Sequence, residues 1–322
     1  MSSIKCALIG LGRIAGALED DPLREKPATH AGAIVDNSKC MLAGGCDPDR
    51  KKRKAFARRW RVKNVFPNSS QMLARLKPDI VHICTPPGQH LAEIAAAVKH
   101  KTPLIVCEKP LASSYREAGN IKKILSKRRT RFLLNHERRF ADDYLYVKKV
   151  ITRQLYGKLV SVQARLFMGR SRTPAQIMLD DGTHMLDIIR FLSGGRFKAS
   201  SVGGNPGRKG GNIYLFCRCG SVCVQMECGN RDHIVFQLDL SFDRGRIVIG
   251  NGVFREYKSL SSPFYRGARS LRKTGRSFSR THYFSGMLKQ AVTYLQQGGR
   301  SPSALNDGLE VIRFLHQLRL IS

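Results

Sequence analysis

Acidic residues are scarce in this chain. Its 322 residues include 24 Asp and Glu against 56 Lys and Arg, which gives a formal net charge of +32. A positive field of this size attracts nucleic acid, anionic lipid and phosphorylated small molecules. The basic residues run through the whole sequence, however, and are densest in residues 50–63, 122–131 and 266–280. A solvated basic surface therefore explains the charge more simply than a dedicated partner does.

Long apolar runs are also missing. No window approaches the length of a membrane span. The apolar stretch at residues 6–18 is interrupted by Arg13, and acidic residues 19–21 follow it where a signal peptide would have a small-residue cleavage site. We therefore expect a cytoplasmic protein without membrane contact.

The remaining composition is ordinary. Hydrophobic residues make up 42% and charged residues 25%, which excludes disordered, collagen-like and disulfide-stapled classes. The length predicts two domains. We place a dinucleotide-binding domain at residues 1–140 and a substrate-binding and oligomerisation domain at 141–322, whose last helix could pack back on the first domain.

Paired C-x2-C knuckles are absent. The nine cysteines lie mostly in apolar runs, and the closest four, Cys217, Cys219, Cys223 and Cys228, do not have the spacing of a structural zinc site. We expect reduced thiols of a cytosolic protein and no metal. The alternation around these cysteines instead predicts a hairpin that turns at Gly220-Ser221, with some cysteines in the core and others outside.

The first 140 residues alternate short apolar runs with amphipathic stretches. This rhythm predicts a doubly wound, parallel α/β sheet of the Rossmann type, with helices on both faces. The expected strands are 4–9, 40–46, 79–84, 104–107 and 132–134, and the expected helices are 48–59, 69–76, 89–99 and 114–126. Residues 19–29 are expected to form a surface loop.

The second part has a different pattern. Helix-like residues 141–153 lead into a strand at 157–167 and a helix at 179–192, and four or five alternating segments follow between residues 201 and 258. These segments predict an α+β domain with a large, mainly antiparallel open sheet. Residues 266–280 are expected to form an extended basic loop, and residues 304–320 a final amphipathic helix.

A glycine-rich motif follows the first predicted strand. In GLGRIA (residues 10–15), Gly10 suits a tight turn and Gly12 lets the backbone approach a pyrophosphate. The following residues, Arg13 and Ile14, are expected to open a helix whose N-terminus binds that group, and the small Ala15 permits close packing. We therefore predict a dinucleotide-binding site here.

Asp47 ends the second predicted strand. A carboxylate at this position accepts hydrogen bonds from the adenosine ribose and favours NAD over NADP. Arg50 and the lysines after it could instead accept the 2′-phosphate of NADP, so both cofactors stay open. Capping of the next helix is a further role for Asp47.

Three further segments carry polar chemistry. Thr85-Pro86 with His90, and Glu108-Lys109, lie near the ends of two predicted strands. In the second half, a helix through DDGTHMLD would place three side chains on one face at i, i+4 and i+7, namely Asp180, His184 and Asp187. Such a face is more polar than a core stripe, although a structural role for the histidine is an equally good explanation.

Together these motifs resemble the glucose–fructose oxidoreductase / inositol dehydrogenase / rhizopine-catabolism (Gfo/Idh/MocA) family. The resemblance covers most of the chain, and it rests on GLGRIA, CDPD, CTPPGQH, CEKP, NHERRF and DDGTHMLD. It implies catalytic roles for Lys109, Asp180 and His184. It also implies cofactor contacts at Gly10, Gly12, Arg13, Asp47, Thr85, Pro86, His90, Glu108 and Lys109. The sequence departs from the family in the length of residues 19–29 and in its charge.

The resemblance implies an enzyme that transfers hydride between NAD(P) and a secondary alcohol of a sugar, polyol or nucleotide sugar. His184 or Lys109 would handle the hydroxyl proton, and the sequence does not decide between them. The expected substrate contacts are Asn135, His136, Arg138 and Asp187, with surface charge as the alternative for Arg138 and Arg139. A homodimer or homotetramer is expected by analogy.

Two other functions compete with this one. The chain could be a non-catalytic dinucleotide-binding regulator, but Lys109, Asp180 and His184 together argue for catalysis. It could also be a basic nucleic-acid-binding protein, which the charge and residues 266–280 favour. The absence of a helix-turn-helix, RNP or zinc-finger signature argues against that function.

Overall fold

The computed structural model describes residues 3–126 and 129–321, which form two compact units. The first unit comprises the residues up to 141 and residues 282–312, and the second comprises residues 142–281 and 313–321. The sequence interpretation placed residues 141–322 in the second domain and allowed only the last helix to pack on the first, whereas α9 (Tyr283–Gln297), the helix before it, clusters with the first unit. The last helix, α10 (Leu305–Gln317), begins in the first unit and ends in the second.

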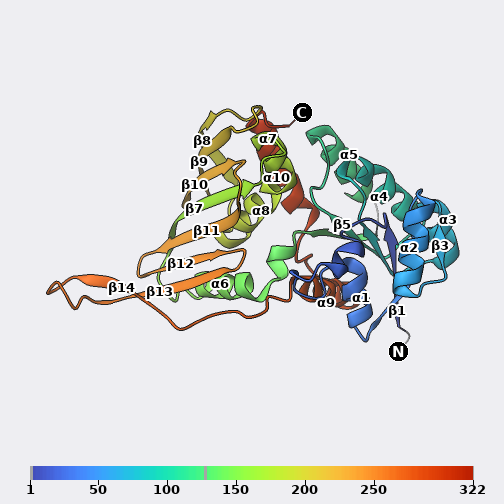
Figure 1. The fold of residues 1–322 in the computed structure, drawn as a ribbon, viewed down its shortest axis with the longest axis horizontal. Coiled ribbons are helices and arrows are strands. Elements are labelled where there is room, and N and C mark those ends of the chain that lie inside the picture. The colour runs from blue at the N-terminus through green and yellow to red at the C-terminus, as the bar shows by residue number, and fades with distance from the viewer. Residues whose placement is uncertain (1–2, 127–128, 322) are drawn as a thin grey trace. The chain divides into compact units, whose positions relative to one another are not determined.

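The first unit is built on a parallel sheet of six strands in the order β3-β2-β1-β4-β5-β6 (Figure 1). Its strands are β1 Ile4–Ile9, β2 Cys40–Cys46, β3 Val65–Phe66, β4 Ile80–Ile83, β5 Leu104–Glu108 and β6 Arg131–Asn135. All residues of β4 and β5 are buried, which explains their continuous apolar runs. The predicted Rossmann sheet is confirmed, and only the two-residue strand β3 was not expected.

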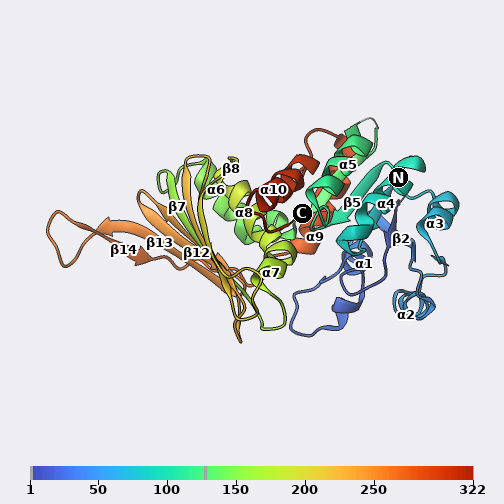
Figure 2. The same cartoon turned by 90° about the horizontal axis from the view of Figure 1, so that it is seen from above.

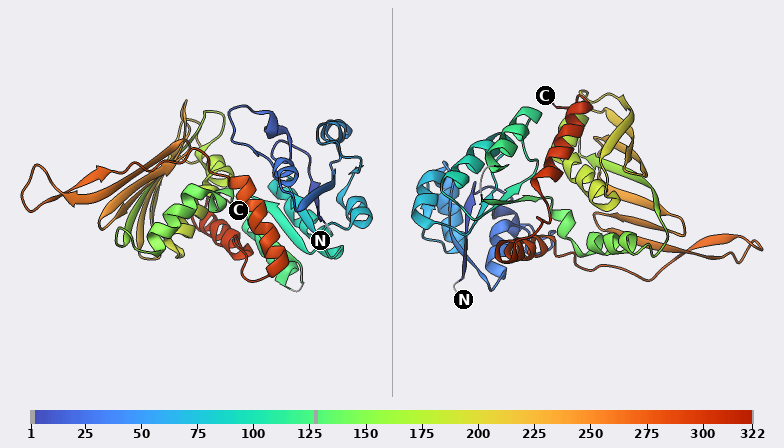
Figure 3. Two further views of the ribbon diagram at one scale, coloured as in Figure 1. Left: turned by 90° about the horizontal axis from the view of Figure 1, so that it is seen from below. Right: turned by 180° about the vertical axis from the view of Figure 1, so that it is seen from behind.

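Helices cover both faces of this sheet (Figure 3). Helices α3, α4 and α5 pack side by side, and α1 packs against α9. The helices are α1 His30–Asp36, α2 Arg50–Trp60, α3 Ser69–Leu76, α4 His90–Lys99 and α5 Tyr115–Ser126, with short 3-10 helices η1 Ala17–Asp20, η2 Pro87–Gln89 and η3 Glu137–Phe140. The order of the strands reverses direction between β1 and β4, which is where doubly wound folds bind their ligands.

The glycine motif does not open an α-helix, contrary to the prediction. Residues 12–16 form turns, η1 follows, and α1 begins only at His30. The cause is the segment 17–29, which interrupts the first crossover. The helical hydrogen-bond pattern is restored across it, because the backbone N–H groups of His30 and Ala31 donate to Ile14 and Ala15 at 3.2 and 2.9 Å. Residues 21–28 are otherwise irregular, as expected for a surface loop.

The second unit contains a sheet of eight strands in the order β14-β13-β12-β11-β7-β10-β9-β8. Only the β7–β10 pair is parallel, so the predicted mainly antiparallel sheet is confirmed. Its elements are α6 Asp142–Thr152, β7 Leu159–Met168, α7 Pro174–Asp180, α8 Gly182–Ser193, β8 Phe197–Gly204, β9 Asn212–Cys219, β10 Val222–Gly229, β11 Ile234–Phe242, β12 Gly245–Gly250, β13 Val253–Ser261 and β14 Arg269–Lys273. Residues 266–280 are therefore not loop throughout, because β14 pairs with β13.

One face of this sheet packs against helices α6, α7 and α8 (Figure 2). Strand β9 shows the resulting alternation, with Leu215 and Cys217 buried while Tyr214 and Phe216 are exposed. The β9–β10 hairpin turns at the predicted position, since Cys219 pairs with Val222. Among its cysteines Cys223 is exposed and the others are buried, as expected.

Residues 3–126 and 129–321 lack two further features. No helix in these ranges is long and apolar enough to cross a membrane. No group of three or more His, Cys, Asp or Glu side chains there could hold a metal ion.

Candidate active site

The glycine turn lies between the carboxyl ends of β1, β2 and β4. Gly10 has φ +84°, and its N–H donates to the Cys46 carbonyl oxygen at 2.8 Å. A Cβ at Gly10 would lie 3.0 Å from the Cys84 carbonyl carbon, so both conformation and space require glycine. A Cβ at Gly12, in contrast, would have no heavy atom within 4 Å. The backbone at Gly12 is therefore open to a ligand.

The Asp47 side chain stabilises this turn through two hydrogen bonds. Its Oδ2 accepts a hydrogen bond from Leu11 N–H at 2.9 Å, and its Oδ1 accepts one from Asp49 N–H at 2.9 Å. The side chain that caps α2 is Asp49, which accepts from the N–H groups of Lys51 and Lys52. The capping role considered for Asp47 is therefore wrong, and its carboxylate holds the end of β2 against the glycine turn.

A cleft of about 610 Å³ opens beside Gly12. Arg13 and Gly16 line one side, and α2 supplies Lys52, Phe56 and Trp60 on the other. Arg58 and Arg59 add further positive charge. The exposed Arg50, predicted to face the cofactor, does not line this cleft. Lys52, two residues further along α2, does.

Two buried polar atoms lie at the ends of β4 and β6. Thr85 Oγ1 and Asn135 Oδ1 have no hydrogen-bond partner among the residues that the structure describes. Between these strands, His90 connects two loops, because its Nε2 lies 2.9 Å from the Thr85 carbonyl oxygen and its Nδ1 3.3 Å from that of Leu111. Burial lowers the pKa of His90. A neutral ring has one N–H, so it donates to only one of these two carbonyl oxygens, and the Thr85 carbonyl oxygen makes the shorter contact.

Glu108, at the end of β5, belongs to a buried polar network. Its Oε1 lies 2.7 Å from His30 Nε2 and accepts a hydrogen bond from Asn135 Nδ2 at 2.6 Å. His30 Nδ1 in turn lies 2.9 Å from His82 Nδ1. Both histidines are fully buried. The network fixes the strand end that carries Lys109, which is half-buried.

The positions of the protons in this network follow from the pKa values. Burial by itself raises the pKa of the Glu108 carboxyl, but the bonds from His30 and Asn135 outweigh it, so the carboxyl is ionised. Burial lowers the pKa of His82 well below its usual range. A carboxylate needs a donor, so His30 donates from Nε2, and the 2.9 Å contact between the two Nδ1 atoms requires a proton on one of them.

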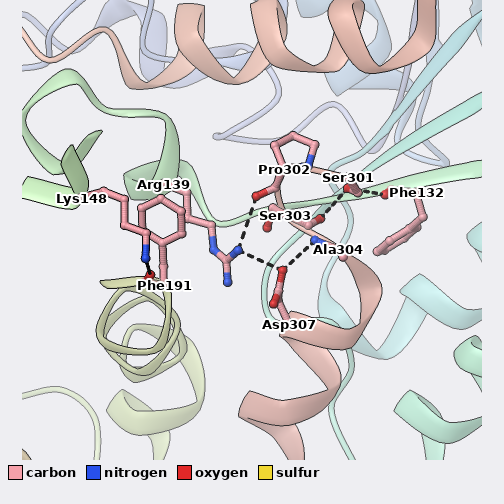
Figure 4. A network of polar contacts seen from close by, with 9 residues as sticks. All are labelled: Phe132, Arg139, Lys148, Phe191, Ser301, Pro302, Ser303, Ala304 and Asp307. Atoms are coloured by element: carbon pink, nitrogen blue, oxygen red, sulfur yellow. Dashed lines mark hydrogen bonds and ion pairs between the residues drawn. The ribbon is translucent and has the colours of Figure 1, made fainter. Parts of the chain in front are cut away.

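The segment after β6 contains both buried and half-buried charges. Asn135 and His136 are buried, whereas Arg138 is half-buried. Arg139 is not surface charge: its Nη1 lies 2.9 Å from Asp307 Oδ2, which also accepts from Ala304 N–H (Figure 4). Both partners of this ion pair are less than a tenth exposed. Arg139 therefore connects η3 to the start of α10.

The second unit does not hold Asp180, His184 and Asp187 on one helix, contrary to the prediction. Helix α7 ends at Asp180, and α8 begins at Gly182 after Asp181. The Asp180 carboxylate pairs with Arg172 Nη1 at 2.9 Å. Arg172 Nη2 lies 2.7 Å from Asp181. One guanidinium thus joins two neighbouring carboxylates and stabilises the break.

His184 and Asp187 do share α8, at i and i+3. His184 is 9% exposed and Asp187 is fully buried. The His184 N–H donates to the Asp181 carbonyl oxygen at 3.1 Å, which places the ring in the first turn of the helix. This first turn follows directly on the paired carboxylates.

Comparison with known proteins identifies the family to which part of the first unit is similar. Residues 4–136 match a family model described as an oxidoreductase family with an NAD-binding Rossmann fold. These residues belong to the Gfo/Idh/MocA family. The match includes the glycine turn, Asp47, Lys109 and Asn135, and it ends in the segment after β6.

Similar proteins extend over more of the chain. D-glucoside 3-dehydrogenase of Escherichia coli is 23% identical over 239 residues, which are 71% of this chain and 61% of that protein. This chain thus matches about three fifths of that relative's length. A dehydrogenase from Chromobacterium violaceum has the same fold, with a TM-score of 0.82 and 14% sequence identity. The similarity covers 99% of this chain and 95% of that one. An oxidoreductase from Agrobacterium radiobacter, solved with NAD+, L-tartaric acid and magnesium, is similar with a TM-score of 0.77 and 19% sequence identity. The similarity covers 98% of this chain and 95% of that one.

Several site residues were not expected from the sequence. His30 and His82 were missed because their partners are distant in the sequence. Arg172 was missed because no local motif marks it, although its partners follow only eight and nine residues later. Lys52 was among the basic residues considered for the 2′-phosphate of NADP, but Phe56 and Trp60 were missed, although their four-residue spacing from Lys52 on α2 indicates one helical face.

The buried His82 makes stability depend on pH. Its pKa is lowered in the folded state, whereas an unfolded histidine titrates near pH 6.5. Below that pH only the unfolded chain binds the proton, so the free energy of unfolding falls as the pH falls. Between about pH 7.5 and 5.5 the loss is roughly 1.4 kcal/mol.

Urea unfolding of His82→Asn at both pH values measures this contribution, because the Asn amide can replace the hydrogen bond at Nδ1. The variant is expected to lose roughly 1.4 kcal/mol of the pH dependence, and the exposed His233→Asn is expected to keep it. The same pH dependence in His82→Asn and the wild type would contradict the assignment.

Proposed function

We propose that this protein is an NAD(P)-dependent oxidoreductase acting on a secondary alcohol of a sugar, polyol or nucleotide sugar. The observation that carries the proposal is the glycine turn beside the buried Asp47, at the switch point of a doubly wound sheet. The family of residues 4–136 supports a nicotinamide dinucleotide as cofactor. The name of the E. coli relative supports a sugar substrate.

The residues at this edge of the sheet fit the cofactor. The open backbone at Gly12 suits the close approach of a pyrophosphate. Thr85 Oγ1 and Asn135 Oδ1 offer polar atoms that lack a partner among the described residues. The Asp47 carboxylate favours the ribose diol of NAD, whereas Arg13 and Lys52 in the cleft would suit the 2′-phosphate of NADP.

The chemistry divides between the cofactor and the protein. When bound, the nicotinamide supplies the hydride acceptor. His184 removes the hydroxyl proton of the substrate. Lys109, as a cation, stabilises the negative charge that develops on the substrate oxygen. Asp180 binds a neighbouring hydroxyl group, since Arg172 holds its carboxylate in place.

A matched pair of glycine variants tests the cofactor site. In both Gly12→Ala and Gly119→Ala, the new methyl group would have no heavy atom within 4 Å, and neither glycine has a positive φ. The fold therefore accepts both changes. Only at Gly12 would the methyl group enter the space assigned to the pyrophosphate, so we expect NAD+ affinity to fall about tenfold or more in that variant alone.

Calorimetric titration with NAD+ and NADP+ at low and high salt measures these affinities. Specific binding survives high salt and differs between the two cofactors, whereas attraction to the basic surface decays with salt equally for both. Equal losses at Gly12 and Gly119, or salt-sensitive binding that does not distinguish the cofactors, would remove the basis of the proposal. The preferred cofactor is then used to screen free sugars, polyols and nucleotide sugars for hydride transfer.

A further inference from the structure

A long β-hairpin extends from the edge of the sheet in the second unit. Strands β13 and β14 pair from Tyr257↔Lys273 to Ser261↔Arg269, and a short turn joins them. Residues 257–273, here called the basic arm, reach beyond the other strands of their sheet (Figures 1 and 2). None of the catalytic or cofactor roles proposed above uses this arm.

The arm carries positive charge along its whole length. Its five cations, all exposed, are Lys258, Arg266, Arg269, Arg272 and Lys273. No Asp or Glu occurs between Glu256 and Asp307. The arm therefore concentrates a charge that elsewhere in the chain is at least partly balanced.

Both faces of the ribbon are cationic. Directly paired residues of an antiparallel ribbon point to the same face, and successive residues alternate. Lys273 and Arg269 therefore share one face, and Lys258 and Arg272 share the other. Lys258 and Arg272 are also direct cross-strand partners, and like charges in that position destabilise a hairpin. A bound anion would relieve this repulsion.

The tip presents two aromatic rings in an ordered turn. Phe264 is 84% exposed and Tyr265 is 72% exposed. Ser262 Oγ accepts hydrogen bonds from the N–H groups of both residues, at 3.2 and 3.1 Å. The turn closes with a bond from Ser262 N–H to the Ala268 carbonyl oxygen at 2.9 Å. The rings are therefore held outward by backbone structure, and no contact of their own buries them.

The base of the arm is anchored in the unit. The buried Glu256 carboxylate accepts hydrogen bonds from Tyr146 at 2.6 Å, from Tyr156 at 2.8 Å and from Thr274 at 2.7 Å. These bonds tie both strands of the hairpin to α6 and to the segment before β7. The arm is thus a fixed projection of the sheet.

We propose that the basic arm binds double-stranded nucleic acid. A two-stranded ribbon fits the major groove of a duplex, where cations on its two faces meet the phosphates of both walls. The exposed rings at the tip suit stacking on bases or wedging between base steps. This binding would be separate from the oxidoreductase activity and does not depend on it.

Two other partners fit the arm less well. A flat anionic membrane would meet the tip, whereas the cations extend back along both strands. A second copy would have to supply acidic groups, but many of those in this unit are already paired: Asp239 with Arg246, Asp232 with Arg170, Glu227 with Arg231, and Asp180 with Arg172. A nucleic acid supplies closely spaced phosphates without this competition.

The test measures binding of the full-length protein to a labelled DNA duplex of about 20 base pairs, by fluorescence anisotropy across salt concentrations of about 50–200 mM. The arm variant is Arg269→Gln/Arg272→Gln/Lys273→Gln. The control, Arg116→Gln/Lys122→Gln/Lys123→Gln, removes the same charge from exposed positions on α5. The logarithm of the affinity falls linearly with the logarithm of the salt concentration, and each lost phosphate contact makes this slope shallower by about 0.9.

We expect the arm variant to bind roughly tenfold or more weakly at about 100 mM salt, with a shallower salt slope, and the control to stay near the wild type. Circular dichroism and thermal unfolding check that both variants remain folded. Equal losses in the two variants, or no binding of the wild type to the duplex, would overturn the proposal. So would arm-dependent binding to vesicles containing anionic lipid in place of the duplex, or an arm-dependent dimer in gel filtration.

The tip is tested separately with aromatic variants. Phe264→Ala/Tyr265→Ala removes the exposed rings of the arm, and Tyr214→Ala/Phe216→Ala removes two exposed rings from β9. We expect about a fivefold or greater loss of duplex affinity for the first variant and an unchanged salt slope, since no charge is removed. A loss of the same size in the β9 variant would show general aromatic adhesion and would contradict a role of the tip.

Discussion

Replacement of His184 by Ala should lower turnover by about 10²–10⁴-fold. His184 lies in the first turn of α8, next to Asp180 and Asp181, which Arg172 holds together. The variant loses the proposed base, whereas the glycine turn and Asp47 belong to the other unit. We therefore expect NAD+ affinity to stay near that of the wild type. Steady-state rates with the best substrate, together with calorimetric titration of the cofactor, measure the two effects.

Two variants make this result specific. His233→Ala removes an exposed histidine of the same unit and should leave turnover unchanged. Lys109→Met should lower turnover without removing the base, so a pH profile of its residual activity that still shows the wild-type base would assign the proton to His184. Full turnover in His184→Ala would end the assignment. If the pH profile of activity loses its base-dependent limb in Lys109→Met and keeps it in His184→Ala, Lys109 is the general base.

The regular part of the fold was predictable because it follows from local patterns. Strands at 4–9 and 40–46 were placed without error, since each is an apolar run of strand length. The interruptions were not predictable. Helix α1 is displaced to His30 because residues 17–29 are inserted, and the helix at 179–192 breaks at Asp181 because Arg172 pairs with the carboxylates at the junction. Both causes involve groups that a periodicity argument does not include.

In the candidate site, too, only the residues with a local structural requirement could be predicted from the sequence. The tight turn at Gly10 could be predicted from the sequence, because its positive φ imposes a condition on the residue itself. The environment of Glu108 could not, because it is made by His30, His82 and Asn135 from three other elements. Arg139 illustrates the limit. A pair of arginines after a strand resembles surface charge, and only the tertiary structure shows that one of them is buried against Asp307.

Removal of the Asp307 carboxylate should destabilise the first unit strongly. Arg139 is 6% exposed, and its guanidinium lies 2.9 Å from that carboxylate. In Asp307→Ala the buried cation loses its counter-ion, and the Ala304 N–H loses its acceptor. We expect a loss of about 3–5 kcal/mol in the free energy of unfolding. Urea unfolding followed by the fluorescence of Trp60, the single tryptophan, reports on this unit directly.

Two further variants separate the charge from the packing. Asp21→Ala breaks the exposed pair with Arg24 and should cost about 1 kcal/mol or less. In the double variant Arg139→Met/Asp307→Leu both charges are gone and the site is filled with apolar groups, so most of the stability should return. A loss in Asp307→Ala as small as that in Asp21→Ala would show that the guanidinium is well solvated. A double variant no more stable than Asp307→Ala would mean that the link between η3 and α10 depends on the hydrogen bonds themselves, and that neutralising the buried charge is not enough to replace them.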